Sequence, residues 1–276
     1  MSSQAPAGER PGGGQTSVRD CLHAEWTKVR TAPGTIWLLA AAMVLTVGVS
    51  TGAAAATRCP SGAGCPVDVT KLSLTGVQVG QALVAILAVL MVGAEYGTGM
   101  IRTTLAAVPR RLTVLGAKAV VVTGLVLAAG TIAVLGSLLA GRLILPGHGF
   151  TPAHGFPPLS LGDGPVLRAA AGSVLYLALI ALLSLGIATI VRDSAAAIGL
   201  VLGLLYLFPI FAALVTDQTV QRHLLQAAPM TAGLDIQATT GLRSLPLSPW
   251  AGLGVMAAWA AGALLAGGLL LRFRDA

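Results

Sequence analysis

Charged side chains are scarce in this chain of 276 residues. They make up 10% of the sequence and aromatic residues 4%, whereas hydrophobic residues make up 55% and the mean hydropathy is +0.84. A soluble domain carries roughly 25% charged residues, so the composition excludes an ordinary soluble protein. The apolar runs are long and unbroken, unlike the alternating segments of a membrane β-barrel. The sequence therefore predicts an all-α, polytopic transmembrane bundle.

Sequence patterns of nucleotide, catalytic and metal sites are also missing. The chain contains no GxxxxGK[ST], HExxH or GxSxG pattern and no Cys/His metal spacing. His148 and His154 lie in a Gly/Pro-rich segment with no accompanying carboxylates or cysteines, which favours an ordinary loop over a metal site. We expect no enzyme activity, metal or cofactor in this chain itself.

Six apolar runs are long enough to cross a bilayer, since each crossing needs about 20 residues. They form one expected transmembrane domain over residues 35–276, with spans near 35–56, 75–94, 114–140, 166–190, 195–215 and 250–271. The polar segment Val191–Ser194 between the fourth and fifth spans predicts a tight hairpin. In the long loop 216–249, Val220–Ala228 and Ala232–Leu242 are compatible with helix.

The N-terminal segment differs from the rest. Residues 1–17 are rich in Gly, Pro and Ser and predict a disordered cytoplasmic tail. In residues 18–34, Leu22, Trp26 and Val29 recur at helical spacing among charges, which predicts an amphipathic helix in the headgroup region; a polar lead-in to the first span is the alternative. A cleaved signal peptide ending near Ala53–Ala56 is disfavoured, because its apolar run is long and begins far from Met1.

The basic residues give an orientation. With the N-terminus inside, 11 of the 17 Lys and Arg residues, Lys118 among them, fall on the inner side and 6 on the outer side. By the positive-inside rule both termini are cytoplasmic. The net charge of +7 is then explained by topology and anionic lipid, and no nucleic-acid partner is expected.

Cysteines occur three times. Cys59 and Cys65 lie in the first outer loop, where they can form a disulfide or remain two free thiols. Cys21 lies alone on the predicted inner side and should stay reduced. Within the spans, Gln78 and Gln81 are the most polar side chains; they can line a pathway or join helices by hydrogen bonds.

The segment EYGTGMIRTTLAAVPRR, Glu95–Arg111, interrupts the apolar sequence after the second span. Gly97 and Gly99 loosen the junction, and the pattern after them predicts a short amphipathic cytoplasmic helix ended by Pro109. Glu95 is the best candidate for a functional charge, with Arg102 as its expected partner. The alternative for Glu95 is a solvated helix end, where the helix dipole disfavours an acid.

This segment resembles the motif after the second span of type-2 ATP-binding-cassette permeases (ABC-2 permeases), especially small actinobacterial ones. HAEWTKVRT at His23–Thr31 and the closing block Leu245–Ala276, which begins LPLSPWAGLG, are also similar to that family. The resemblance implies an interfacial helix and a cytoplasmic coupling segment that contacts a separate ATPase. Matching residues are, for the interfacial helix, Trp26, Lys28 and Arg30, and for the coupling segment, Glu95, Tyr96, Gly97, Gly99, Arg102, Thr103 and Leu105.

What the resemblance implies for function is a permease subunit in a bacterial plasma membrane. It would pair with a second permease, identical or related, and with ATPase subunits that bind ATP and magnesium. An apolar route favours export of an amphipathic drug, lipid or peptide-like cargo. An ion-coupled secondary transporter and a non-transporting membrane anchor are the alternatives; the first is disfavoured because the span centres hold almost no ionisable residue.

Overall fold

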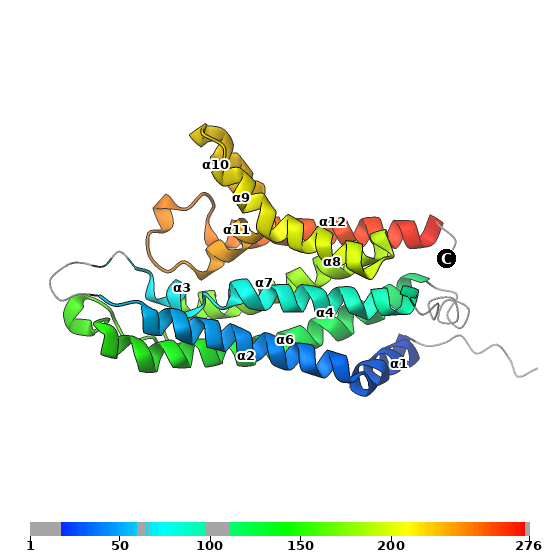
Figure 1. Cartoon of the computed structure of the whole chain (residues 1–276), viewed down its shortest axis with the longest axis horizontal. Helices are drawn as coiled ribbons and strands as arrows, with labels where there is room; N and C mark the ends of the chain where they lie inside the picture. The colour runs from blue at the N-terminus through cyan, green and yellow to red at the C-terminus, as the bar shows by residue number, and fades with distance from the viewer. Residues whose placement is uncertain (1–17, 60–64, 66, 98–110, 274–276) are drawn as a thin grey trace, which may run out of the picture.

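The structure is a computed structural model that describes residues 18–59, 65, 67–97 and 111–273. Within this part of the chain all regular secondary structure is helical, and the long helices run side by side along one axis (Figure 1). Six of the helical segments are long and apolar enough to cross a membrane. The prediction of an all-α bundle with six membrane-spanning helices is confirmed.

The six spanning segments begin and end within about four residues of the predicted bounds. They are α2 (Pro33–Ala56), α4 (Val77–Gly97), α6 (Arg111–Ile144), α7 (Gly164–Val191), the segment α8–η3–α9 and α12 (Pro249–Phe273). The fifth consists of α8 (Ser194–Leu202), the π-helical η3 (Gly203–Leu207) and α9 (Phe208–Ala213). The predicted hairpin turn is present, because Arg192 ends α7 with a positive φ and the Asp193 carboxylate accepts from the Ala196 N–H to begin α8.

Helix α7 forms the centre of the bundle. It packs against α12, α4 and α6, while α2 covers α6 and α4. Small residues allow close approach, as is usual between membrane helices. A Cβ on Gly186 would lie 2.5 Å from the α12 backbone, and one on Gly252 would lie 2.0 Å from the Ala232 carbonyl oxygen. The core therefore depends on backbone proximity as well as on apolar side chains.

Short elements connect the spans at the end away from α1. They comprise α3 (Val69–Ser73), η1 (Leu145–His148), η2 (Pro152–His154), α10 (Gln218–Ala227), α11 (Pro229–Leu234), η4 (Asp235–Gln237) and η5 (Leu242–Ser244). Helices α9 and α10 project away from the bundle (Figure 1). Helical structure was predicted for Ala232–Leu242; that prediction is wrong for residues 238–241, where the chain is extended from Ala238 and becomes helical again at Leu242. Asp235 and Gln237 are buried.

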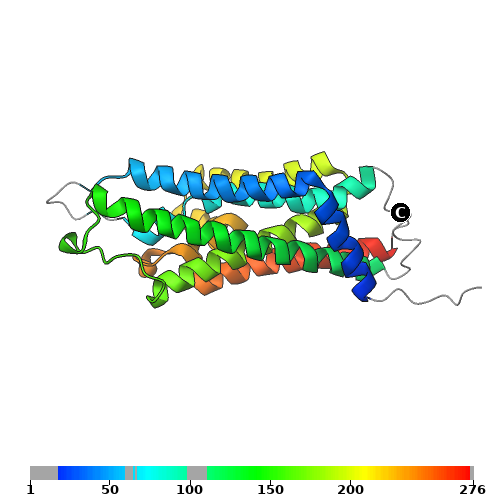
Figure 2. The same cartoon turned by 90° about the horizontal axis from the view of Figure 1, so that it is seen from below.

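Helix α1 (Val18–Thr31) crosses the opposite end of the bundle at a steep angle to α2 (Figure 2). The break between the two helices lies at Ala32, which is extended (φ −91°, ψ 101°) before Pro33. A residue that precedes proline avoids the helical region, so Pro33 both ends α1 and begins α2. We call this end of the molecule the α1 end, and the end with the connecting elements the α3 end.

Candidate functional site

Helix α1 packs one side against the bundle, and that side includes an acidic residue. Its buried residues are Cys21, Glu25 and Val29, whereas Trp26 is exposed and Leu22 only half-buried. Leu22 and Trp26, two of the three residues on the apolar face predicted for the headgroup region, are therefore not the residues that pack into the bundle, and the contact of that face with lipid stays a prediction. An acid takes the central place because basic side chains on α1 and α6 compensate for its charge.

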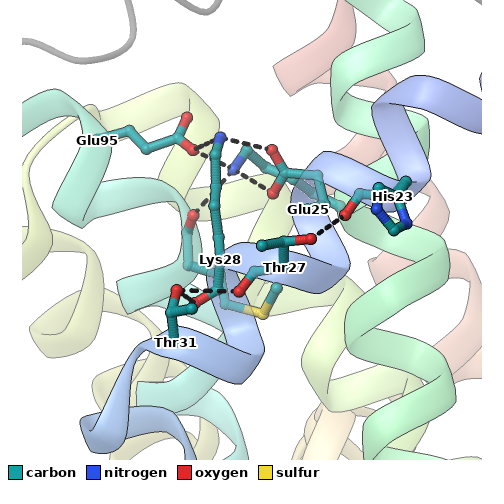
Figure 3. Close-up of polar contacts among 8 residues, drawn as sticks. His23, Glu25, Thr27, Lys28, Thr31 and Glu95 are labelled. Carbon is teal, nitrogen blue, oxygen red and sulfur yellow. Dashed lines mark hydrogen bonds and ion pairs between the residues drawn. The ribbon is translucent and has the colours of Figure 1, made fainter.

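Four charged residues from three helices meet where α1 crosses the bundle (Figure 3). Lys28 Nζ lies 2.8 Å from Glu25 Oε1 and 2.7 Å from Glu95 Oε1. Lys118 Nζ lies 2.8 Å from Glu25 Oε2 and 2.7 Å from Glu95 Oε1. We call these four residues the charge quartet. It joins α1 to the last turn of α4 and to the first third of α6.

Three members of the charge quartet are almost inaccessible to solvent. Glu25, Glu95 and Lys118 are 4%, 5% and 3% exposed. Buried charges are tolerated only when they are paired and hydrogen-bonded. Lys118 meets this condition, because its ammonium also donates to the Met91 carbonyl at 3.2 Å and so uses all three N–H groups. The quartet as a whole has no net charge.

Lys28 is the accessible member of the charge quartet, with a side chain that is 36% exposed. Burial alone would lower its pKa, but hydrogen bonds and charge interactions with Glu25 and Glu95 outweigh burial and raise the pKa of Lys28. Lys28 therefore stays protonated at neutral pH. It is the most exposed member of the charge quartet.

Beside the charge quartet lies a cavity of about 470 Å³. All four quartet residues line it, together with apolar side chains of α2 and α4 such as Leu38, Leu87 and Leu90. Ligand sites in proteins measure roughly 300–1,000 Å³ and combine apolar walls with a few polar groups. The cavity matches this description.

The expected partner of Glu95 was Arg102, but Glu95 pairs with Lys28 and Lys118. Glu95 is also buried, which contradicts the alternative of a solvated helix end. Lys118 was counted among the basic residues of the inner side; its side chain lies buried between helices, and the side of the membrane on which it lies stays a prediction. The remaining coupling residues Gly99, Arg102, Thr103 and Leu105 lie outside the described residues.

Other predicted site residues surround the charge quartet without joining it. Tyr96 is half-buried, and the Arg192 guanidinium lies 5.7 Å from its ring centroid. Gly97, Trp26 and Arg30 are exposed. The Tyr96–Arg192 contact ties the turn between α7 and α8 to the same end of α4.

Gln78 and Gln81 lie deeper in α4 and join helices. The Tyr176 hydroxyl of α7 donates to Gln81 Oε1, and the Tyr206 hydroxyl of η3 donates to the Gln78 carbonyl. Gln81 is fully buried. The hydrogen-bonding alternative is thus observed for the side chain of Gln81, whereas Gln78 takes part through its backbone carbonyl; a role of either residue in a pathway stays a prediction.

At the α3 end, Cys59 and Cys65 form a disulfide with a Cα–Cα distance of 6.0 Å. Cys21 is a free, buried thiol. Among the described residues, no group of three or more His, Cys, Asp or Glu side chains is placed to hold a metal ion.

Sequence reasoning missed Glu25 and Lys118. Two signals were present, namely the spacing of three residues between Glu25 and Lys28, and a lysine inside an otherwise apolar run. Ion pairs form readily at that spacing on a helix. The same reasoning missed Asp68, which holds two segments together at the α3 end.

No protein-family model matches the chain, and no curated protein matches it.

Proposed function

We propose that this chain is the membrane-spanning permease subunit of an ATP-driven ABC-2 transporter in a bacterial plasma membrane, with both termini in the cytoplasm. The proposed cargo is an amphipathic drug, lipid or peptide-like molecule that is exported. The energy source is a separate ATPase that binds ATP and magnesium, and a second permease subunit completes the transporter. The sequence resemblance at Glu95–Arg111 and His23–Thr31 supports this proposal.

The observation that carries the proposal is the charge quartet. Helix α4 leads directly into residues 98–110, the segment expected to contact the ATPase, and Glu95 lies two residues before α4 ends. A push on that segment would reach α1 through Lys28 and α6 through Lys118. The quartet therefore supplies a short route from a partner's contact point to three helices.

Charge pairs suit such a route because they have more than one satisfactory arrangement. Glu95 Oε1 accepts from both lysines, and each lysine also has a Glu25 oxygen. A shift of α4 can weaken one contact while the same cation keeps its second carboxylate. In this proposal ATP binding would move α4 relative to α1 without leaving a buried charge unpaired.

Co-purification with the ATPase encoded beside this chain tests the proposal. Arg102→Glu combined with Gly99→Pro should abolish complex formation and transport-coupled ATP hydrolysis. Arg142→Glu, an exposed change at the outer end of α6, is the matched control and should leave both intact. If the double variant binds the ATPase and supports coupled hydrolysis like the unmodified chain, the coupling assignment is wrong.

Orientation is tested by labelling single cysteines in intact cells with a membrane-impermeant maleimide, in a chain whose native cysteines are replaced by alanine. Gly97→Cys is suitable because a Cβ there meets nothing within 4 Å. Leu161→Cys, also exposed, is the counterpart at the α3 end. We expect labelling at 161 only; labelling at 97 would put the proposed coupling segment on the wrong side.

An ion-coupled secondary transporter is the second candidate, favoured by one observation. Buried ionisable residues in membrane helices commonly mark ion or proton pathways, and Lys118 with Glu95 is such a pair. Reconstitution of the chain alone separates the two functions. Uptake driven by an ion gradient without an ATPase supports the carrier; transport only with ATPase and ATP supports the permease.

A further inference from the structure

The cavity beside the charge quartet offers unequal surroundings to a ligand. Its apolar lining includes Leu38 on α2 and, on α4, Leu87 and Leu90, which precede Glu95 by about one to two helical turns. Its polar lining is the charge quartet together with the hydroxyl-bearing Thr31 and Thr35. A molecule that fills this space needs a polar head at one end and an apolar body at the other.

One hydrogen-bond donor and one acceptor of the charge quartet remain available to a ligand. Lys28 has three N–H donors, of which two go to Glu25 Oε1 and Glu95 Oε1. Glu95 Oε2 is buried and has no hydrogen-bond partner among the described residues. A buried acceptor without a partner is unfavourable, because it has lost its hydrogen bonds to water. One donor and one acceptor are therefore still available on side chains that line the cavity.

The charges of the quartet select the charge of the head. Two carboxylates face two ammonium groups, so the quartet is neutral. A purely anionic head would come close to both carboxylates, and a purely cationic head close to both lysines. A zwitterionic head avoids both problems, because its cation can donate to Glu95 Oε2 while its anion accepts from Lys28.

We infer that this cavity binds an aminophospholipid, an amphiphile whose head carries a primary ammonium and a phosphodiester. The ammonium N–H satisfies Glu95 Oε2, and the phosphate accepts the third Lys28 N–H. The first part of an acyl chain lies along the wall of Leu38, Leu87 and Leu90. About 470 Å³ is enough for the head and part of one chain, so the rest of the lipid stays in the bilayer.

The site also has a regulatory consequence. A phosphate on Lys28 competes with the carboxylates for the same ammonium, so the lipid adjusts how tightly α1 is held to α4. This inference does not depend on an ATPase, and its test uses the purified chain alone. Its failure would leave the proposed transport function untouched.

Native mass spectrometry of the full-length chain in detergent measures the binding. Phosphatidylethanolamine, phosphatidylcholine and phosphatidylglycerol with identical acyl chains are compared, together with soluble phosphoethanolamine. Phosphatidylcholine is the sharpest comparison, since it is zwitterionic but has no N–H donor. We expect phosphatidylethanolamine to bind about ten-fold more tightly than the other two lipids, the effect of one charge-assisted hydrogen bond, and phosphoethanolamine not to be retained.

Glu95→Gln should reduce phosphatidylethanolamine binding to the level of phosphatidylcholine, and Lys28→Gln should weaken both. Gly34→Leu tests the cavity without touching the charge quartet: Gly34 lines the cavity, and a Cβ there meets nothing within 4 Å. It should weaken binding of every lipid at least five-fold. Gly48→Leu is its matched control on the same helix, exposed and outside the cavity, and should bind like the unmodified chain.

Four results would overturn the inference. The first is equal binding of phosphatidylethanolamine and phosphatidylcholine. The second is a preference for phosphatidylethanolamine that persists in Glu95→Gln, and the third is unchanged binding in Gly34→Leu. The fourth is retention of soluble phosphoethanolamine as tightly as the lipid, which would show that the site binds a free headgroup and that its apolar residues have no part. If Glu95→Gln does not fold, the inference is still tested by the comparison of headgroups in the unmodified chain and by lipid binding to Gly34→Leu.

Discussion

The two ends of the bundle are held together by different chemistry. At the α1 end, ion pairs between side chains connect α1 to α4 and α6, and three of the four charged residues are almost wholly buried. At the α3 end, the Asp68 carboxylate accepts from the backbone N–H groups of Lys71, Thr239 and Thr240, and a disulfide closes the neighbouring loop. One end relies on pairs of side chains and the other on backbone and covalent bonds.

This difference bears on which end can move. A backbone N–H offers one direction for a hydrogen bond, and a disulfide fixes two segments outright. Long lysine side chains can follow a carboxylate over a range of helix positions. The comparison supports a mobile α1 end and a fixed α3 end, and the predictions below test each side of it.

The largest effect is expected from Lys118→Met, which leaves Glu25 and Glu95 facing each other with only Lys28 between them. Removing one partner of a buried ion pair destabilises a protein by about 3–5 kcal/mol. Denaturant unfolding of the purified chain, followed by circular dichroism, measures the loss. Arg142→Met on the same helix is the control, because Arg142 is exposed.

A second variant shows whether the loss comes from charge. Adding Glu25→Gln and Glu95→Gln to Lys118→Met removes the unpaired acids and should restore much of the stability. If Lys118→Met is no more destabilising than Arg142→Met, the charge quartet does not hold α1, and the contrast between the two ends fails.

The sequence was informative where one physical requirement dominates. Membrane-spanning helices need long apolar runs, so all six were found, and the turn at Val191–Ser194 followed from its length and polarity. The side of α1 that packs on the bundle could not be predicted. A pattern that counts only apolar residues cannot show that Lys118, 93 positions away, compensates for the buried acid Glu25.

The candidate site could be predicted only in part for the same reason. Glu95 was identified because an acid at the end of an apolar helix is unusual, yet its partners lie 67 and 23 residues away in the chain. Asp68 was missed because its role depends on Thr239 and Thr240 from a loop that follows four further spans. Helix positions come from local chemistry, whereas ion-pair partners come from the packing of helices.

At the α3 end, Asp68→Asn should reduce the free energy of unfolding by less, about 3 kcal/mol, because the asparagine amide keeps one of the two oxygens that accept the backbone N–H groups. Burial would raise the pKa of Asp68, but the backbone hydrogen bonds from Lys71, Thr239 and Thr240 outweigh burial and lower it. The folded state therefore prefers the ionised form. This stabilisation is present above the unfolded pKa of about 3.9 and is lost as pH falls through the lower folded value.

Hydrogen exchange of residues 239–244 is the direct measurement for Asp68→Asn. Protection there should fall at pH 7 in the variant, while protection in α1 should not change. A variant that loosens α1 as much as this loop would show that the two ends are not independent.

Opening the disulfide should reduce the free energy of unfolding by a smaller amount, about 2 kcal/mol. The stabilisation by a disulfide rises with the length of the loop that it closes, and this loop is short. Counting thiols in the denatured chain checks the pairing first. Alkylation without reductant should modify only Cys21, and alkylation after reduction should modify three cysteines. Three adducts without reductant would remove the covalent element from the α3 end.

The smallest predicted effect on stability is that of Asp235→Asn, which should stabilise the folded state, whereas the variants above destabilise it. Burial raises the pKa of Asp235 to about 6, and the nearby Lys71 offsets this only in part. A folded pKa above the unfolded value means that the folded state prefers the protonated acid. The contribution to stability is therefore full below about pH 4 and is lost as pH rises through 6. Asp235→Asn should raise the melting temperature by about 2 °C at pH 7.5 and leave it unchanged at pH 4. A lower melting temperature at pH 7.5 would instead make Asp235–Lys71 a stabilising ion pair, so that charge pairs would hold both ends of the bundle.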